Sequence, residues 1–189
     1  MDVPENTRIL VHVCCAPCAA PSGERLRLHG YDVILYFSNS NISPDEEYHK
    51  RLLYVRKLAG IWDVVVEEDS YDHAEWLLQI SGLENEPEKG RRCEKCFAYS
   101  LQRTAMMADR LDIPYFTTTL TLSPHKISKM IFEIGKQYPK YLPFNFKKED
   151  GFLRSIQLSK DYDLYRQSYC GCEFSLQASR QSSPKSPTH

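Results

Sequence analysis

The chain has 189 residues, of which 42% are hydrophobic and 26% charged, a balance typical of one globular domain with a sizeable core. No apolar run approaches the ~20 residues of a membrane-spanning helix, and the N-terminal residues lack the basic and apolar regions of a signal peptide. We therefore expect a cytoplasmic protein with no membrane partner. The net charge of -1 argues against a generally basic nucleic-acid-binding protein, so a nucleic-acid partner would need a local basic patch.

Strands and helices are predicted to alternate along the chain. Short β-branched runs predict strands, and longer amphipathic stretches with capping residues predict helices. The expected strands are residues 8–13, 32–37, 62–67 and 115–120. The expected helices are residues 19–29, 44–60, 71–80, 94–111 and 123–138, with Ser43 as the N-cap of the second. This alternation predicts an α/β fold, with a parallel sheet covered by helices on both faces. We expect a single domain over residues 1–175 and a disordered tail over 176–189.

Seven cysteines fall into three clusters. Clustered cysteines in an intracellular chain of this size indicate metal binding or catalysis rather than a disulfide scaffold. The first cluster separates the first predicted strand from the first helix. In parallel sheets, ligands bind outside the carboxyl ends of the strands, near the point where strand order reverses, so we expect the site there. The clusters are Cys14, Cys15 and Cys18, then Cys93 and Cys96, then Cys170 and Cys172.

The chemistry of these clusters has several interpretations. Cys15 and Cys18 alone could form a redox pair of the thioredoxin type, opening a helix whose N-terminus lowers thiol pKa values. The two thiols of RRCEKCF provide half of a metal site. The CGC segment can chelate a metal or form a strained, easily reduced disulfide. Structural zinc uses four ligands in separated pairs, and an all-thiolate set fits iron–sulfur at least as well, so spacing alone leaves the metal undecided.

Four segments, taken together and in order, resemble the non-cobalamin epoxyqueuosine reductases of the QueH family. They are HVCCAPCA at 12–19, GRRCEKCF at 90–97, TTTLTLSPHK at 117–126 and YRQSYCGCEFS at 165–175. The segment SNSNISP at 38–44 departs from the family's pattern. The resemblance implies a fold similar to the adenine-nucleotide α-hydrolases (the HUP fold) without their ATP loop. It also implies an oxidoreductase that converts epoxyqueuosine to queuosine at the wobble position of tRNA, the last step of queuosine biosynthesis.

The resemblance further implies particular roles for the cysteines. A [4Fe-4S] cluster would be held by Cys14, Cys15, Cys93 and Cys96. Cys18 is a candidate ligand of a second iron, and Cys170 with Cys172 would be a redox-active pair able to form a disulfide. The implied partners are a tRNA with a GUN anticodon and an external electron donor. The candidate substrate-binding residues, which flank the cysteine motifs, are Arg91, Arg92, Tyr165 and Arg166.

Other residues and functions are also considered. Cations on predicted loops could position an anticodon loop through its phosphates; they are Arg91, Arg92, Lys126, Lys147, Lys148 and Arg154. Asp69 and Asp72 are interpreted as solvated loop carboxylates rather than acids, and His12 and His125 as hydrogen-bonded core or cap residues rather than ligands. The alternatives are an iron–sulfur-dependent tRNA thiolation or desulfidase enzyme and a zinc-stabilised RNA-binding module.

Overall fold

The computed structural model describes residues 6–182. Its sheet has four strands, β1 (Thr7–His12), β2 (Tyr31–Phe37), β3 (Val66–Glu68) and β4 (Tyr115–Thr118), in the order β3-β2-β1-β4. All neighbouring strands are parallel, as predicted. After β3 the chain returns to the opposite side of β1 to form β4, so the strand order reverses between β1 and β4. The carboxyl ends of these two strands are therefore the expected place for a ligand.

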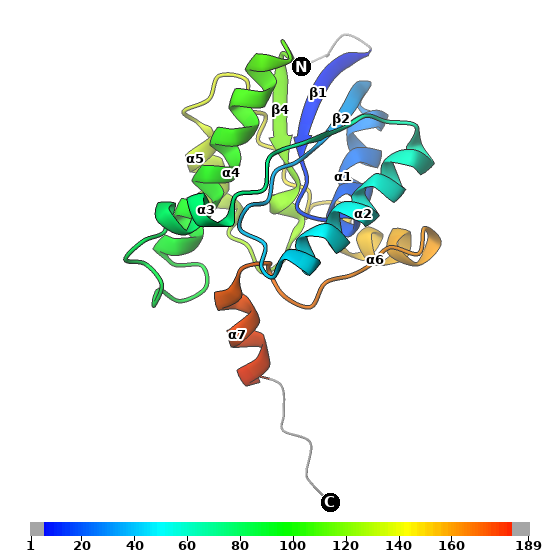
Figure 1. The fold of residues 1–189 in the computed structure, drawn as a ribbon. Coiled ribbons are helices and arrows are strands. Elements are labelled where there is room, and N and C mark those ends of the chain that lie inside the picture. The colour runs from blue at the N-terminus through cyan, green and yellow to red at the C-terminus, as the bar shows by residue number, and fades with distance from the viewer. Residues whose placement is uncertain (1–5, 183–189) are drawn as a thin grey trace, which may run out of the picture.

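Helices cover both faces of this sheet (Figure 1). The seven α-helices of the described residues are α1 (Ala16–Leu28), α2 (Asp45–Trp62), α3 (His73–Gln79), α4 (Arg91–Arg110), α5 (Ser128–Gly135), α6 (Gly151–Asp161) and α7 (Glu173–Ser182). A short 3₁₀ helix, η1 (Thr119–Leu122), follows β4 directly. No helix of residues 6–182 is long and apolar enough to cross a membrane.

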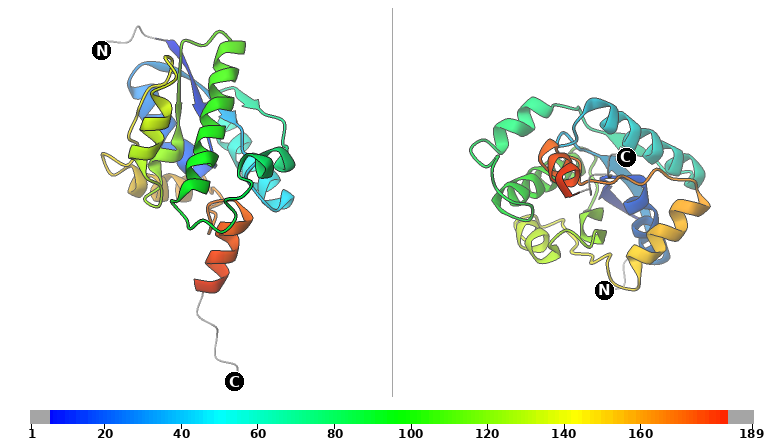
Figure 2. Two further views of the ribbon diagram at one scale, coloured as in Figure 1. Left: turned by 90° about the vertical axis from the view of Figure 1, so that its left-hand side faces the viewer. Right: turned by 90° about the horizontal axis from the view of Figure 1, so that it is seen from below.

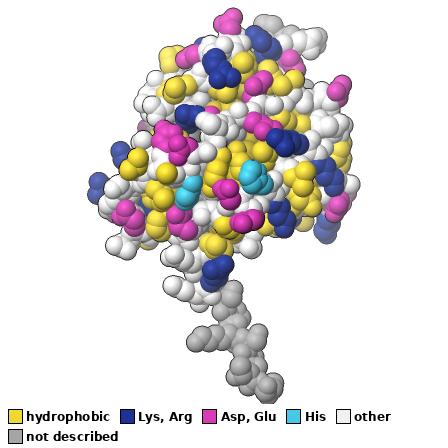
Figure 3. Space-filling view, viewed as in Figure 1, with side chains coloured by type: hydrophobic (Ala, Val, Ile, Leu, Met, Phe, Trp, Pro, Cys, Tyr) yellow, Lys and Arg dark blue, Asp and Glu magenta, His cyan; other side chains and the backbone are white. Residues whose placement is uncertain are grey.

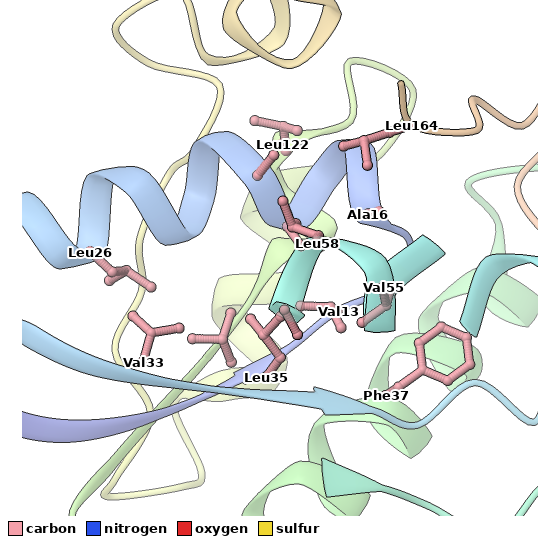
Figure 4. Packing of buried hydrophobic residues seen from close by; sticks show 14 of the residues in the cluster. Val13, Ala16, Leu26, Val33, Leu35, Phe37, Val55, Leu58, Leu122 and Leu164 are labelled. Atoms are coloured by element: carbon pink, nitrogen blue, oxygen red, sulfur yellow. The ribbon is translucent and has the colours of Figure 1, made fainter. Parts of the chain in front are cut away.

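Alternate residues of β1 build two separate cores. Ile9 and Val11 belong to the core that the sheet shares with α1 and α2, whereas Leu10 belongs to the core shared with α4 and α5. This follows from the two-residue period of a strand, which sends neighbouring side chains to opposite faces. Figure 4 shows the first core, with Val33 and Leu35 of β2 among its buried side chains. Each fully buried aliphatic side chain contributes about 1.5–3 kcal/mol, so both faces of the sheet are firmly anchored.

Several element boundaries differ from the predicted ones. Helix α2 begins after Pro44, which is its N-cap in place of Ser43, and ends at Trp62, where Asp63 takes a left-handed φ of 56°. The third strand therefore starts at Val66 instead of residue 62. The single helix expected over 123–138 is instead the short α5, because the segment after η1 is irregular.

The predicted disordered tail starts too early. Helix α7 runs through the whole first half of this tail, to Ser182, and projects from the end of the domain where the strands finish (Figure 2). Phe174 anchors this helix, because its ring lies 4.5 Å from the Arg92 guanidinium and 6.4 Å from the ring of Trp76. The sequence did not predict this contact, because the segment is mostly polar. The rest of the predicted tail, 183–189, lies outside the described residues.

Candidate metal and redox site

The first cysteine cluster lies where the sheet topology predicts a ligand. Cys14 and Cys15 directly follow the end of β1, and Cys15 is the N-cap residue of α1. On the adjacent strand β4, the chain continues into η1, and the hydroxyl of Thr119 lies 3.8 Å from the Cys14 sulfur. The sheet therefore holds these thiols at its switch point, as the sequence predicts.

Cys14, Cys15 and Cys18 form a compact group that we call the inner trio. Their sulfur atoms all lie within 4.8 Å of one another, and the sulfurs of Cys14 and Cys15 are 3.8 Å apart. Thiolates bound at about 2.3 Å to one tetrahedral ion lie about 3.8 Å apart, so this spacing suits shared metal coordination. Cys14 and Cys15 are 7% and 1% exposed. In the described part of the chain, this is the one group of three such ligands.

The three thiols of the inner trio differ in pKa. Hydrogen bonds from Cys15 and Cys18 hold the pKa of Cys14 well below its usual range. Burial, followed by the hydrogen bond to Cys14, raises the pKa of Cys15 to about 12. Hydrogen bonds to Cys14 and Cys15 raise the pKa of Cys18 well above its usual value. Without a metal, Cys15 and Cys18 are therefore protonated at neutral pH, and binding one metal ion to all three sulfurs would release at least two protons.

The other cysteines form the outer quartet, which comprises Cys93, Cys96, Cys170 and Cys172. Cys93 and Cys96 lie in the first turns of α4, and the CGC segment precedes α7. Cys96 and Cys172 pack against the same buried group around Trp76. Burial raises the pKa of Cys93 and Cys96, and negative charge on Cys170 and Cys172 raises them further. All seven cysteines are free in the structure, so the CGC pair is in its dithiol form.

Two adjacent hollows connect the cysteine groups. The main cavity, about 660 Å³, is lined by Cys18, Cys93, Cys170 and Cys172. A small hollow of about 20 Å³ is lined by Cys14, Cys96 and Cys170. Each hollow thus meets one member of the inner trio and at least two of the outer quartet. The fold brings three motifs that are far apart in sequence to a single place.

A buried arginine holds the CGC segment. Arg51 is 1% exposed, donates hydrogen bonds to the carbonyls of Cys170 (2.9 Å) and Tyr169 (3.2 Å), and pairs with Glu47 at 2.7 Å. Gly171 has a φ of 143°, a conformation that requires glycine, and its carbonyl accepts a hydrogen bond from the Ser43 amide. Sequence reasoning missed Arg51. Its one available signal was an arginine on the apolar face of α2, one turn from Tyr48 and Val55.

Two further side chains face the cysteine sulfurs. The indole nitrogen of Trp76 is buried and completes no hydrogen bond. Burial raises the pKa of Cys96, and the nearby Trp76 N–H opposes this effect without forming a hydrogen bond of normal geometry to the sulfur. Similarly, the Gln167 amide opposes the effect of burial on Cys15, while its own Oε1 is buried without a partner beside the main cavity. Such donors stabilise negative charge on sulfur, which is the state that binds metal.

The predicted substrate-binding residues divide into two pairs. Arg92 and Arg166 line the main cavity, but both are engaged: Arg92 donates to loop carbonyls, including that of Glu84 at 2.8 Å, and Arg166 donates to Ser159 at 3.0 Å. Arg91 is exposed at the start of α4. Tyr165 lies against α2, where its hydroxyl donates to Glu47 at 2.9 Å.

Several other predicted candidates have structural partners. Asp69 forms an ion pair with Arg103, Asp72 caps α3 by accepting from the amide of Glu75, and His12 hydrogen-bonds inside the core. His125 is exposed on the wall of the main cavity. Among the loop cations, Arg154 pairs with Glu24, and the Lys147 ammonium donates to the Lys126 carbonyl. Lys148 is exposed, whereas Lys126 lines both hollows.

The family model and the curated relatives that match this chain share one description. Residues 9–178 match the family model described as Epoxyqueuosine reductase QueH. A relative of that name from Streptococcus pyogenes serotype M1 is 44% identical, over 88% of this chain and 69% of the relative. Another, from Thermotoga maritima, is 36% identical over 92% of each chain, and one from Acinetobacter baylyi is 34% identical over 93% of this chain and 84% of the relative.

Among solved structures, the U34-tRNA thiolase NcsA from Methanococcus maripaludis with its [4Fe-4S] cluster superposes with a TM-score of 0.58 at 10% identity. The match covers 96% of this chain and 66% of the thiolase, so this chain spans slightly less than two thirds of that neighbour. At this identity the likeness concerns the fold alone, and it confirms the predicted α/β class. By the family model and the curated relatives, the chain belongs to the epoxyqueuosine reductase QueH family.

Proposed function

We propose that this protein reduces epoxyqueuosine to queuosine at the wobble position of tRNA. The observation that carries the proposal is that three cysteine motifs of a QueH-family chain converge on adjoining hollows, the larger about 660 Å³. A substrate in that cavity would lie beside Cys18 and the CGC pair at once. A tRNA substrate also implies that the protein acts in the cytoplasm.

The donor set fits an iron–sulfur centre. It consists of thiols, which are the soft ligands that iron–sulfur clusters use, and the buried Trp76 indole and Gln167 amide approach two of their sulfurs. We assign a [4Fe-4S] cluster to Cys14, Cys15, Cys93 and Cys96, and a second iron to Cys18, whose sulfur lies within 4.8 Å of Cys14 and Cys15. A cluster held there supplies single electrons at low potential.

The CGC pair can supply the electrons and protons that the reduction consumes. Removing the oxygen of an epoxide to leave an alkene consumes two electrons and two protons, and the oxygen departs as water. Oxidation of the Cys170 and Cys172 thiols to a disulfide releases two electrons and two protons. One dithiol thus matches one epoxide, and an external electron donor must then reduce the disulfide again.

The cavity walls suit a modified nucleobase. Phe97 and Met130 provide apolar surface, while Arg166 and Gln167 provide polar groups. The face shown in Figure 3 mixes basic and acidic side chains without a large patch of one sign. Because the net charge of the protein is -1, binding of tRNA rests on cations around the cavity, such as Lys89, and not on the charge of the whole protein.

Metal analysis tests the cofactor. The full chain is purified without oxygen and its iron, acid-labile sulfide and zinc are measured. Iron with sulfide is expected. A colourless protein that contains zinc alone and is fully active would overturn the cluster assignment. A zinc protein that binds RNA without turnover would favour the zinc-stabilised RNA-binding module.

A substrate assay tests the reaction. The loaded protein is incubated with tRNA carrying epoxyqueuosine and a strong reductant, and the nucleosides are analysed by mass spectrometry. Loss of one oxygen from the modified nucleoside is expected, whereas sulfur gain or loss would favour the thiolation or desulfidase alternative. Cys93→Ala should abolish turnover and colour. The matched control is Gln102→Ala, an exposed position on the same helix, which should leave both unchanged.

A further inference from the structure

Lys126 lies where the two hollows of the site adjoin. It lies in the irregular segment between η1 and α5, and its side chain lines both the main cavity and the small hollow. Among the residues described, it shares this position only with Phe97 and Cys170. Its backbone is fixed, since its carbonyl accepts a hydrogen bond from the Lys147 ammonium.

The surroundings of Lys126 are dominated by sulfur. Cysteines of both groups line the same two hollows as Lys126: Cys14, Cys96 and Cys170 in the small one, and Cys18, Cys93, Cys170 and Cys172 in the main one. Removal from water disfavours the charged form of Lys126, and three of these cysteines, Cys170, Cys14 and Cys18, oppose this effect when ionised and raise its pKa.

Three other cations of the site are already occupied. Arg51 is neutralised by Glu47 and bound to the CGC carbonyls. Arg92 donates to loop carbonyls, and Arg166 donates to serines of α6. Lys89 lines only the main cavity, so Lys126 is the one cation among the described residues that lines both hollows.

We propose that Lys126 is the counter-cation of the cysteine site, holding positive charge against both cysteine groups and thereby setting how readily the site accepts electrons. The proposal rests on the metal and redox site assigned under the proposed function. Adding an electron makes the site more negative, and a fixed cation nearby stabilises that state. Lys126 acts through this field as a positioning residue, and no proton transfer is assigned to it.

The test measures the midpoint potential of the loaded full-length protein by anaerobic titration followed by electron paramagnetic resonance, together with its iron content. The variants are Lys126→Met, which removes the charge and keeps the side-chain length, and Lys126→Arg, which keeps the charge. Lys129→Met, an exposed lysine on α5, is the matched control. We expect a lower midpoint for Lys126→Met, and near wild-type values for Lys126→Arg and Lys129→Met.

Each other outcome has a defined meaning. Normal iron content with an unchanged midpoint in Lys126→Met would overturn the proposal, as would the same shift in Lys126→Arg. Loss of iron in Lys126→Met but not in Lys126→Arg would support it, because charge is then needed to gather the thiolates. Loss of iron in both variants would overturn it in favour of packing. A wild-type protein inactive on epoxyqueuosine tRNA would refute the proposed substrate and leave the potential measurement unaffected.

Discussion

The inner trio and the outer quartet are built in different ways. The trio follows the central strand β1 directly, and its Cys14 and Cys15 are almost fully buried. The quartet is assembled from the start of α4 and the segment before α7, and its Cys170 is exposed. Sheet hydrogen bonds hold the first group, whereas a single buried arginine clamps the CGC segment of the second. The buried trio suits metal binding, and the exposed Cys170 suits exchange of electrons with substrate and donor, whereas Cys93 and Cys96 of the quartet remain assigned to the cluster.

The largest effect should come from removing one sulfur from each group in turn. Cys14→Ser should abolish both iron loading and turnover, because it removes a buried ligand of the assigned cluster, whose lowered pKa favours the metal-binding thiolate. Cys170→Ser should abolish turnover but keep the iron, if the CGC pair acts only in electron transfer. Iron content and mass-spectrometric turnover measure the two outcomes. Loss of iron from Cys170→Ser would make this residue a ligand and erase the proposed division between the groups.

The second largest effect should come from replacing Arg51, which holds the CGC segment. Arg51→Met leaves Glu47, whose side chain is 11% exposed, without its partner, and breaking a buried ion pair costs about 3–5 kcal/mol. Urea unfolding of the protein should report this loss, with Arg51→Lys intermediate. Arg56→Met is the matched control on the same helix, because its ion pair with Glu68 is largely exposed and worth about 0–1 kcal/mol. Equal destabilisation by both variants would show that Arg51 is no special clamp.

Proton release should distinguish the inner trio further. The raised pKa values of Cys15, about 12, and Cys18 mean that binding an ion to all three sulfurs releases at least two protons, while the lowered pKa of Cys14 reduces its own share. Affinity for Co²⁺ should therefore rise by at least about 100-fold per pH unit between pH 6 and 8. Absorbance titration of a variant with all four outer cysteines changed to serine measures this. A tenfold slope would mean that only one of the two thiols loses its proton.

The smallest effect should follow from removing one donor to sulfur. Trp76→Phe keeps a ring in the buried group but deletes the N–H that faces Cys96. We expect a lower midpoint potential and about tenfold lower activity, as for other residues that support metal ligands. Trp62→Phe, at the end of α2 and packed against a different core from that of Trp76, is the control. Equal changes in both variants would assign the effect to general packing.

The sequence was informative where function depends on local pattern. The strand–cysteine–helix order around Cys14 predicted a site at the switch point of a parallel sheet, and the alternation of strands and helices predicted a sheet covered on both faces. Both expectations rest on short-range rules of periodicity and connection. The fold class and the strand count of the sheet followed from the same rules.

The contacts between distant segments could not be read in this way. Arg51 and Cys170 are separated by 119 positions, and nothing in either segment indicates the other. The same applies to Phe174, whose contact with Arg92 explains why a polar segment is helical. Lys126 was one of several loop cations in the sequence, and only the three-dimensional packing set it apart. These contacts are determined by packing between elements and not by the secondary-structure propensity of each segment.

The position of β1 inside the sheet has a consequence for synthesis of the protein. A nascent chain that ends before residue 115 has β1 as an open edge, because its neighbour β4 has not yet been made. An unpaired apolar edge invites association with other chains, and the thiols at its end would be exposed to oxidants. The CGC segment leaves the ribosome later still. Metal loading is therefore expected to follow completion of the chain, which makes the loaded centre a marker of correct folding.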